Sequence, residues 1–137
     1  MSRDIQGSKR IAKATYDFST AGGDVAALIL PDADILPKGA VVTDVKAVVR
    51  TTVTSGGAAT IAITAGGVTL KAAETIANSV YNGTGIVDVI RAGNSGSTGT
   101  AKYIPISATS SAAIGITVGT AALTAGVVDF YVEYLVP

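Results

Sequence analysis

The chain has 137 residues with ten basic and ten acidic side chains, so its formal net charge is zero, and this length indicates one domain. It contains no Cys, His or Trp, which excludes disulfides and thiolate metal sites and removes the commonest general base and metal ligand. Charged residues make up only 15% of the chain and hydrophobic residues 48%, so few charges are available to cover its surface.

The chain lacks the sequence features of a membrane or secreted protein. No apolar run approaches the roughly 20 residues that a membrane-spanning helix needs, and the longest runs are short, such as "VAALIL" at 25–30. The first residues, "MSRDIQGSKRIAK", are polar and lack the apolar stretch of a secretory signal. We therefore expect a soluble protein that is made in the cytoplasm, has no membrane partner, and has its excess apolar surface covered by other protein.

Basic residues are concentrated at the N-terminus. Arg3, Lys9, Arg10 and Lys13 are opposed only by Asp4, so four positive charges and one negative charge fall within the first thirteen residues. A basic arm can bind phosphates, but four charges without interleaved aromatic residues, in a chain of pI about 6.1, do not indicate a nucleic-acid partner. We expect either a solvated extension or an arm that docks on an acidic neighbouring subunit.

Alternation of apolar and polar residues predicts a series of short strands along the rest of the chain. These strands are expected at 13–19, 25–30, 41–53, 58–65, 85–90, 101–107, 113–119 and 128–135. Turns rich in glycine or proline separate them, at 20–23, 31–39, 64–67 and 124–126. The "SGG" at 55–57 is expected to close a hairpin between its flanking strands, with its glycines at the positive φ that a tight turn requires.

Only the segment "LKAAETIANSV" at 70–80 lacks alternation and contains helix formers. It predicts one or two helical turns, with Asn78 near the C-terminal cap. The whole pattern indicates an all-β fold, an antiparallel β-sandwich or jelly-roll-like barrel of about eight strands with at most one short helix. We divide the chain into a basic N-terminal arm at 1–12 and a single β-sandwich domain at 13–137, with the strand order left open.

The last strand has one apolar side and one mixed side. The apolar side consists of Val128, Phe130, Val132 and Tyr134, and the mixed side of Asp129, Tyr131, Glu133 and Leu135. Free chain ends usually fray unless something holds them. A strand this apolar, so close to the last residue, is therefore expected to be paired in a sheet and covered by a neighbouring copy.

Two loops contain residues that sometimes bind ligands. Asp32 and Asp34 in "PDAD" offer oxygen ligands for Ca²⁺, but no glycine at the required spacing and no closing Glu follow, so an Asx turn is favoured. The tract "RAGNSGSTGTAK" at 91–102 lacks the GK[ST] ending and the helix of a phosphate-binding loop. We expect an exposed loop there, and neither metal nor cofactor at either place.

The sequence does not indicate an enzyme. Its ten carboxylates are spread along the chain, and no pair is placed for acid–base catalysis. Catalysis by Ser and Lys stays open, because neighbours in space are not visible in a sequence. We expect no catalytic residues.

Assembly is the economical way to cover an apolar surface with few charges. A folded monomer of this mass exposes roughly 6,600 Å², and an ordinary interface takes about 800 Å² from each partner. A closed ring such as a trimer uses two such patches on each subunit. We therefore expect a homo-oligomer, with a trimer as the favoured form.

Three stretches resemble small virion structural proteins of tailed bacteriophages: "ATYDFSTAGGDVAALIL", "LPKGAVVTDVKAVVRTTVTSGGAATIAI" and "IGITVGTAALTAGVVDFYVEYL". Within that group, the chain is most similar to head decoration (cement) proteins, from about Ala14 to Leu135. The resemblance implies a β-sandwich protomer that forms trimers on the capsid exterior of the virion. It also implies attachment to the major capsid protein, and no active site.

On this hypothesis, the basic segment attaches to the capsid through Arg3, Lys9, Arg10 and Lys13. The last strand lies near the contact between copies, with Phe130, Tyr131 and Tyr134 as the interface residues. A phage tail, fibre or spike protein is an alternative. A carbohydrate-binding module is another, with Tyr81 and Tyr103 as the aromatic platforms.

Overall fold

The computed structural model describes residues 9–77, 79–82, 86–91, 104–107 and 109–136. Its elements, in chain order, are β1 (Lys9–Asp17), α1 (Phe18–Ala21), β2 (Ala27–Ile29), β3 (Ile35–Leu36), β4 (Val41–Ser55), β5 (Thr60–Ala65), β6 (Val68–Thr75), α2 (Ser79–Asn82), β7 (Ile86–Arg91), β8 (Ile104–Pro105), β9 (Ala112–Gly119) and β10 (Leu123–Leu135). No helix in these ranges is long and apolar enough to cross a membrane.

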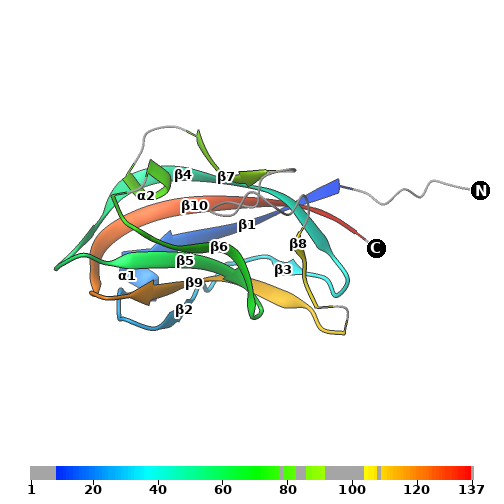
Figure 1. Cartoon of the computed structure of the whole chain (residues 1–137), viewed down its shortest axis with the longest axis horizontal. Helices are drawn as coiled ribbons and strands as arrows, with labels where there is room; N and C mark the ends of the chain where they lie inside the picture. The colour runs from blue at the N-terminus through cyan, green and yellow to red at the C-terminus, as the bar shows by residue number, and fades with distance from the viewer. Residues whose placement is uncertain (1–8, 78, 83–85, 92–103, 108, 137) are drawn as a thin grey trace, which may run out of the picture.

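Two antiparallel sheets face each other, as Figure 1 shows. One sheet has the order β1-β10-β4-β7, with β8 also paired to β4, and the other has the order β2-β9-β5-β6, with β3 also paired to β9. Of the described strands, eight have three residues or more, and β3 and β8 have two each. The expected all-β antiparallel sandwich is confirmed, and the helical structure is limited to two turns of four residues.

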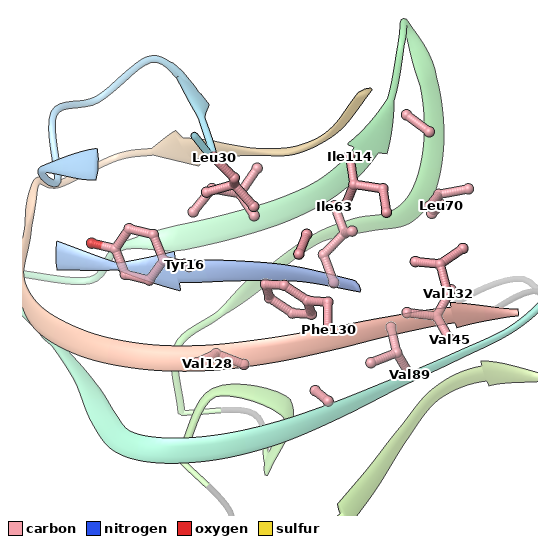
Figure 2. Packing of buried hydrophobic residues seen from close by; sticks show 14 of the residues in the cluster. Tyr16, Leu30, Val45, Ile63, Leu70, Val89, Ile114, Val128, Phe130 and Val132 are labelled. Atoms are coloured by element: carbon pink, nitrogen blue, oxygen red, sulfur yellow. The ribbon is translucent and has the colours of Figure 1, made fainter. Parts of the chain in front are cut away.

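The sandwich is held together by a core of mostly small and branched side chains. Figure 2 shows Tyr16, Phe130 and Val132 of one sheet facing Ile63 and Ile114 of the other. The core also contains the fully buried alanines Ala12, Ala14, Ala40, Ala47, Ala59 and Ala65. Burial of these apolar faces supplies the main stabilisation, at about 25 cal/mol per Å² of apolar area.

β10 lies in the middle of its sheet, between β1 and β4. Its antiparallel partners begin with the pairs Lys9↔Leu135 on one side and Val41↔Leu135 on the other. The strand near the end of the chain is therefore paired along both edges, which confirms that it lies within a sheet. Because the first described residue pairs with the end of β10, both ends of the described chain lie at the same end of the sandwich.

The expected hairpin around "SGG" is wrong. β4 belongs to the sheet of β10, and β5 belongs to the sheet of β9. β4 is fifteen residues long and follows β10 through several register shifts as far as the pair Leu123↔Ser55, after which the chain passes to the other sheet. Gly56 and Gly57 are not among the glycines with positive φ. A local turn signal marks where a strand ends, but not which sheet the chain enters next.

The turn at 64–67 is the hairpin that the chain does form. Ala65 of β5 pairs with Val68 of β6, which leaves a loop of two residues. Gly66 and Gly67 have φ of 56° and 95°. A type I′ turn requires positive φ at both central positions, which glycine adopts without a steric penalty.

The helix expected at 70–80 is wrong over most of its length. β6 extends to Thr75, and α2 begins only at Ser79, while Asn78 lies outside the described residues. Register shifts between β5 and β6 mark a bulge, beside which the consecutive residues Leu70 and Lys71 are both buried. A bulge adds a residue to one strand and breaks the alternation by which strands are recognised.

β1 begins at Lys9, whereas the sequence placed the start of the domain at residue 13. It ends at Asp17, whose side chain accepts a hydrogen bond from the Ser19 N–H at 2.9 Å and caps α1. Residues 9–12 therefore belong to the sandwich and not to an arm. Residues 1–8 lie outside the described part of the chain.

Candidate functional site: two outer faces of the sandwich

The outward side of the first sheet is called the charged face here. Its described side chains on β1, β10, β4 and β7 are Lys9, Ile11, Lys13, Thr15, Asp129, Tyr131, Glu133, Asp44, Lys46, Val48, Arg50 and Ile86. They point outward because side chains alternate along a strand and the intervening residues fill the core. Charged and apolar groups thus share one surface.

Strand register arranges the charged face in rows across the sheet. One row contains Lys13, Tyr131 and Lys46, because Lys13 pairs with Tyr131 and Tyr131 pairs with Lys46. The next row places Glu133 directly opposite Asp44. Two like charges opposite each other are unfavourable unless other groups compensate them.

Nearby basic and hydroxyl groups compensate these two carboxylates. The Lys46 ammonium lies 3.1 Å from Asp44 Oδ2. Lys9 Nζ lies 3.8 Å from Glu133 Oε1, which also accepts a hydrogen bond from the Thr43 hydroxyl at 2.9 Å. The acidic row is thus tied to its own surroundings.

Asp129 is the buried acid of this face, with a side chain that is 2% exposed. It accepts hydrogen bonds from the Thr15 hydroxyl at 2.6 Å and from Arg50 Nε. Burial raises the pKa of Asp129, but the hydrogen bonds from Thr15 and Arg50, with the charges of Lys13 and Arg50, outweigh it and lower the pKa below 3.8. Asp129 is therefore an ionised group that joins β1, β10 and β4.

Lys13 and Tyr131 form a cation–π pair in the middle of the face. The Lys13 ammonium lies 5.7 Å from the centre of the Tyr131 ring. Among the described residues, no carboxylate lies within ion-pair distance of this ammonium. Its charge therefore remains available to a partner.

A shallow groove of about 340 Å³ crosses the same face. It is lined by Ile11, Lys46, Val48, Ile86 and Tyr131. Ile86 is 71% exposed and Ile11 is 64% exposed, although both are large aliphatic residues. A smaller hollow of about 60 Å³ shares Ile11, Lys46 and Tyr131 with the groove and is also lined by Asp44 and Glu133.

The structure brings together residues to which the sequence gave different roles. Lys9 and Lys13, expected at the capsid, share the charged face with Tyr131, expected between copies. Arg10 is exposed on β1, and Arg3 lies outside the described residues.

Two of the three expected interface residues are placed wrongly. Phe130 is 1% exposed and Tyr134 is 8% exposed, because both point into the core between the sheets. A side chain that already packs inside its own sandwich has no surface left for a second copy. Of the three, only Tyr131 lies on the outer side.

The sequence reasoning missed Ile11, Val48 and Ile86. Ile11 was placed in the arm, although a strand that starts at Lys9 puts it on the outward side. Ile86 and Val48 come together only because β7 pairs with β4. No local pattern reveals that pairing.

The aromatic platforms of the carbohydrate alternative are not found. Tyr81 is fully buried and donates a hydrogen bond from its hydroxyl to the Ile61 carbonyl at 3.1 Å. Burial and the charge of Glu74 raise its pKa. Tyr81 is therefore a core residue, and Tyr103 lies outside the described residues.

The "PDAD" loop protects a sheet edge. The Lys13 N–H donates to Asp34 Oδ2, and the Asp34 N–H donates to the Lys13 carbonyl, both at 2.9 Å. These bonds occupy the edge of β1 that faces away from β10. Within the described ranges, no group of three or more acidic side chains is placed to hold a metal ion.

The second sheet has a different outer surface, called the uncharged face here. The strands β2, β9 and β5 contain no charged residue. Their outward positions are Ala27, Thr60, Ala62, Thr64, Ala113, Gly115, Thr117 and Gly119. The two faces of one sandwich therefore differ sharply in charge.

Comparison with known proteins gives a fold likeness and no family. No protein family matches the chain, and no curated protein matches it. Among solved structures, the fold is similar to a chain of the cyanophage Pam1 capsid asymmetric unit, with a TM-score of 0.50 and 18% identity. The similarity covers 100% of this chain and 91% of that chain. At this level of identity, the likeness shows a shared fold.

Proposed function

We propose that this protein is a structural component of a phage virion, and specifically a decoration (cement) protein that binds the outside of the assembled head as a homotrimer. Its partner is then the major capsid protein, and its place is the capsid exterior. The observation that carries the proposal is the fold likeness over the whole chain to a chain of a phage capsid asymmetric unit. The two contrasting outer faces support it.

The charged face is the better candidate for contact with the capsid. Its exposed isoleucines, Ile11 and Ile86, offer apolar contact, and its charges offer specificity. Lys9 and Lys13, the basic residues of the capsid hypothesis whose side chains lie on this face, are described there. One face of one copy cannot contact the capsid and another copy over the same residues at once.

The uncharged face is the better candidate for contact between copies. Permanent homo-oligomer interfaces are depleted in charge and more apolar than the rest of the surface. The outward residues of β9 and β5, such as Thr117 and Ala62, are small and uncharged. A trimer would bury this surface without leaving unpaired charges.

The physical effect of such a protein is linkage between binding and assembly. A protein that binds the assembled shell but not separated capsid subunits stabilises the shell by its binding free energy, summed over many copies. Three connected binding faces add avidity without stronger individual contacts. This mechanism needs no catalytic residue.

The test is binding to heads of the phage that encodes the chain. The purified protein is mixed with assembled heads lacking it and with dissociated capsid subunits, and co-sedimentation measures the bound copies. We expect saturable binding to heads, weak binding to subunits, and a higher temperature of head disruption when the protein is bound. Equal binding to both forms, or none to heads, would contradict the proposal.

A further inference from the structure

We infer that the groove on the charged face recognises a protein segment that presents a carboxylate beside an aliphatic side chain. This inference rests on the proposed function, in which the segment belongs to the surface of the assembled head. It specifies the partner's chemistry, and it names Lys13, Tyr131 and Ile86 as the centre of recognition.

The charge argument begins with the balance of the charged face. Three acids with described side chains lie on it, and each is close to a basic group of the same chain: Asp44 to Lys46, Glu133 to Lys9, and Asp129 to Arg50. The remaining basic group is Lys13, which stands over the Tyr131 ring without a described carboxylate within ion-pair distance. A partner carboxylate at this point completes an ion pair that the chain leaves open.

The apolar argument comes from the lining of the groove. Ile11, Val48 and Ile86 line it together with the Tyr131 ring. An aliphatic side chain placed there covers isoleucines that are otherwise largely exposed, and burial of one such side chain is favourable by about 1.5–3 kcal/mol in general. A carboxylate near Lys13 and an aliphatic group in the groove fit one short peptide segment.

Charge complementarity favours another protein over a second copy of this chain. If two charged faces met, the described carboxylates of each would arrive already paired with their own Lys or Arg residues. Each Lys13 would then remain without an acidic partner in a less polar environment, which is costly. Self-association through this face is therefore an alternative that the experiment must detect.

The experiment uses the full chain, assembled heads of the encoding phage, and matched pairs of variants. Lys13→Glu reverses the charge beside the groove, and Lys38→Glu makes the same change at an exposed lysine in the turn before β4. Ile86→Ser removes the aliphatic lining, and Ile35→Ser makes the same change at an exposed isoleucine of β3. Lys13→Arg is the conservative rescue, and thermal melting establishes that each variant is folded.

We expect Lys13→Glu to weaken binding about tenfold at low salt, and this difference to shrink as salt screens the charge. Ile86→Ser should weaken binding at all salt concentrations, because apolar contact is not screened. Lys13→Arg, Lys38→Glu and Ile35→Ser should bind like the original chain.

The outcomes separate this inference from the proposed function. If the original chain binds heads but Lys13→Glu binds equally well or better, the acidic segment is excluded and the decoration role stands. If Ile86→Ser and not Ile35→Ser prevents self-association in sedimentation, the groove is a contact between copies and the inference is overturned. If the original chain does not bind heads, both proposals fail.

Discussion

At the scale of single residues, Asp129 shows how one side chain can be placed in an unfavourable position and still stabilise the fold. It lies on the outward side of a central strand but is almost fully buried, between Thr15 of β1 and Arg50 of β4. A buried carboxylate without partners would be strongly unfavourable. Here a hydroxyl and a guanidinium satisfy it, so that its charged form is favoured in the folded state.

Asp129→Asn should therefore lower the free energy of unfolding by about 1–3 kcal/mol at neutral pH, the range for a hydrogen bond to a charged group. The pKa of Asp129 is lowered on folding, so its contribution is fully present well above pH 4 and is lost as the pH falls below 3.8. Denaturant unfolding from pH 7 to pH 3 should show the two proteins converging in acid.

Asp24→Asn is the control for this prediction, because Asp24 is an exposed acid in the loop before β2. It should change the free energy of unfolding little at any pH. A loss in Asp129→Asn that is equally large at pH 3 and pH 7 would show that packing, and not charge, holds Asp129 in place.

At the scale of elements, the pairing of β1 with β10 defines where the domain begins. β1 covers one edge of β10 from the pair Lys9↔Leu135 to the pair Asp17↔Val127. Ala12, inside the region first taken for an arm, is buried in the core. The start of the sandwich is thus set by a partner more than a hundred residues away.

Two truncations test this boundary. Removal of residues 1–8 should leave the melting transition nearly unchanged, whereas removal of residues 1–12 should destabilise the fold by about 2–4 kcal/mol. The longer truncation removes several ladder hydrogen bonds, each with a net contribution of about 1 kcal/mol, together with the buried Ala12. Equal melting temperatures for the two truncations would show that residues 9–12 are not part of the sheet.

At the scale of the whole molecule, the sandwich separates its two surfaces by charge. The chain has few charged residues, and those on β1, β10 and β4 gather on one outer face, while β2, β9 and β5 have none. A molecule with two such faces can meet two different kinds of surface at once. This property suits a small protein that assembles with itself and also binds a larger shell.

The faces lead to a prediction on oligomer mass. Thr117→Lys places a charge in the middle of the uncharged face, where Thr117 pairs with Ala27 and Ala62, and should lower the mass measured by sedimentation equilibrium. Tyr131→Lys changes the charged face and should leave the mass unchanged. The reverse result would return Tyr131 to the contact between copies, and a monomeric original chain would contradict the homo-oligomer itself.

The sequence alone predicted what depends on local alternation. It predicted the all-β class, most strands, and the inward positions of Val128, Phe130, Val132 and Tyr134, because a strand turns successive side chains to opposite sides. It also predicted the glycine turn at 64–67, because only glycine adopts positive φ readily at two successive positions. These signals lie within a few residues of the feature that they describe.

The tertiary structure decided what depends on partners distant in the sequence. The sheet that receives β5, the bulge that hides part of β6, and the start of β1 at Lys9 all follow from strand pairing. The candidate site has the same origin, because Ile11, Tyr131, Val48 and Ile86 come from four strands. Pairing between strands far apart is decided by the free energy of the whole packed core, whereas local alternation reports only which side of one strand is apolar.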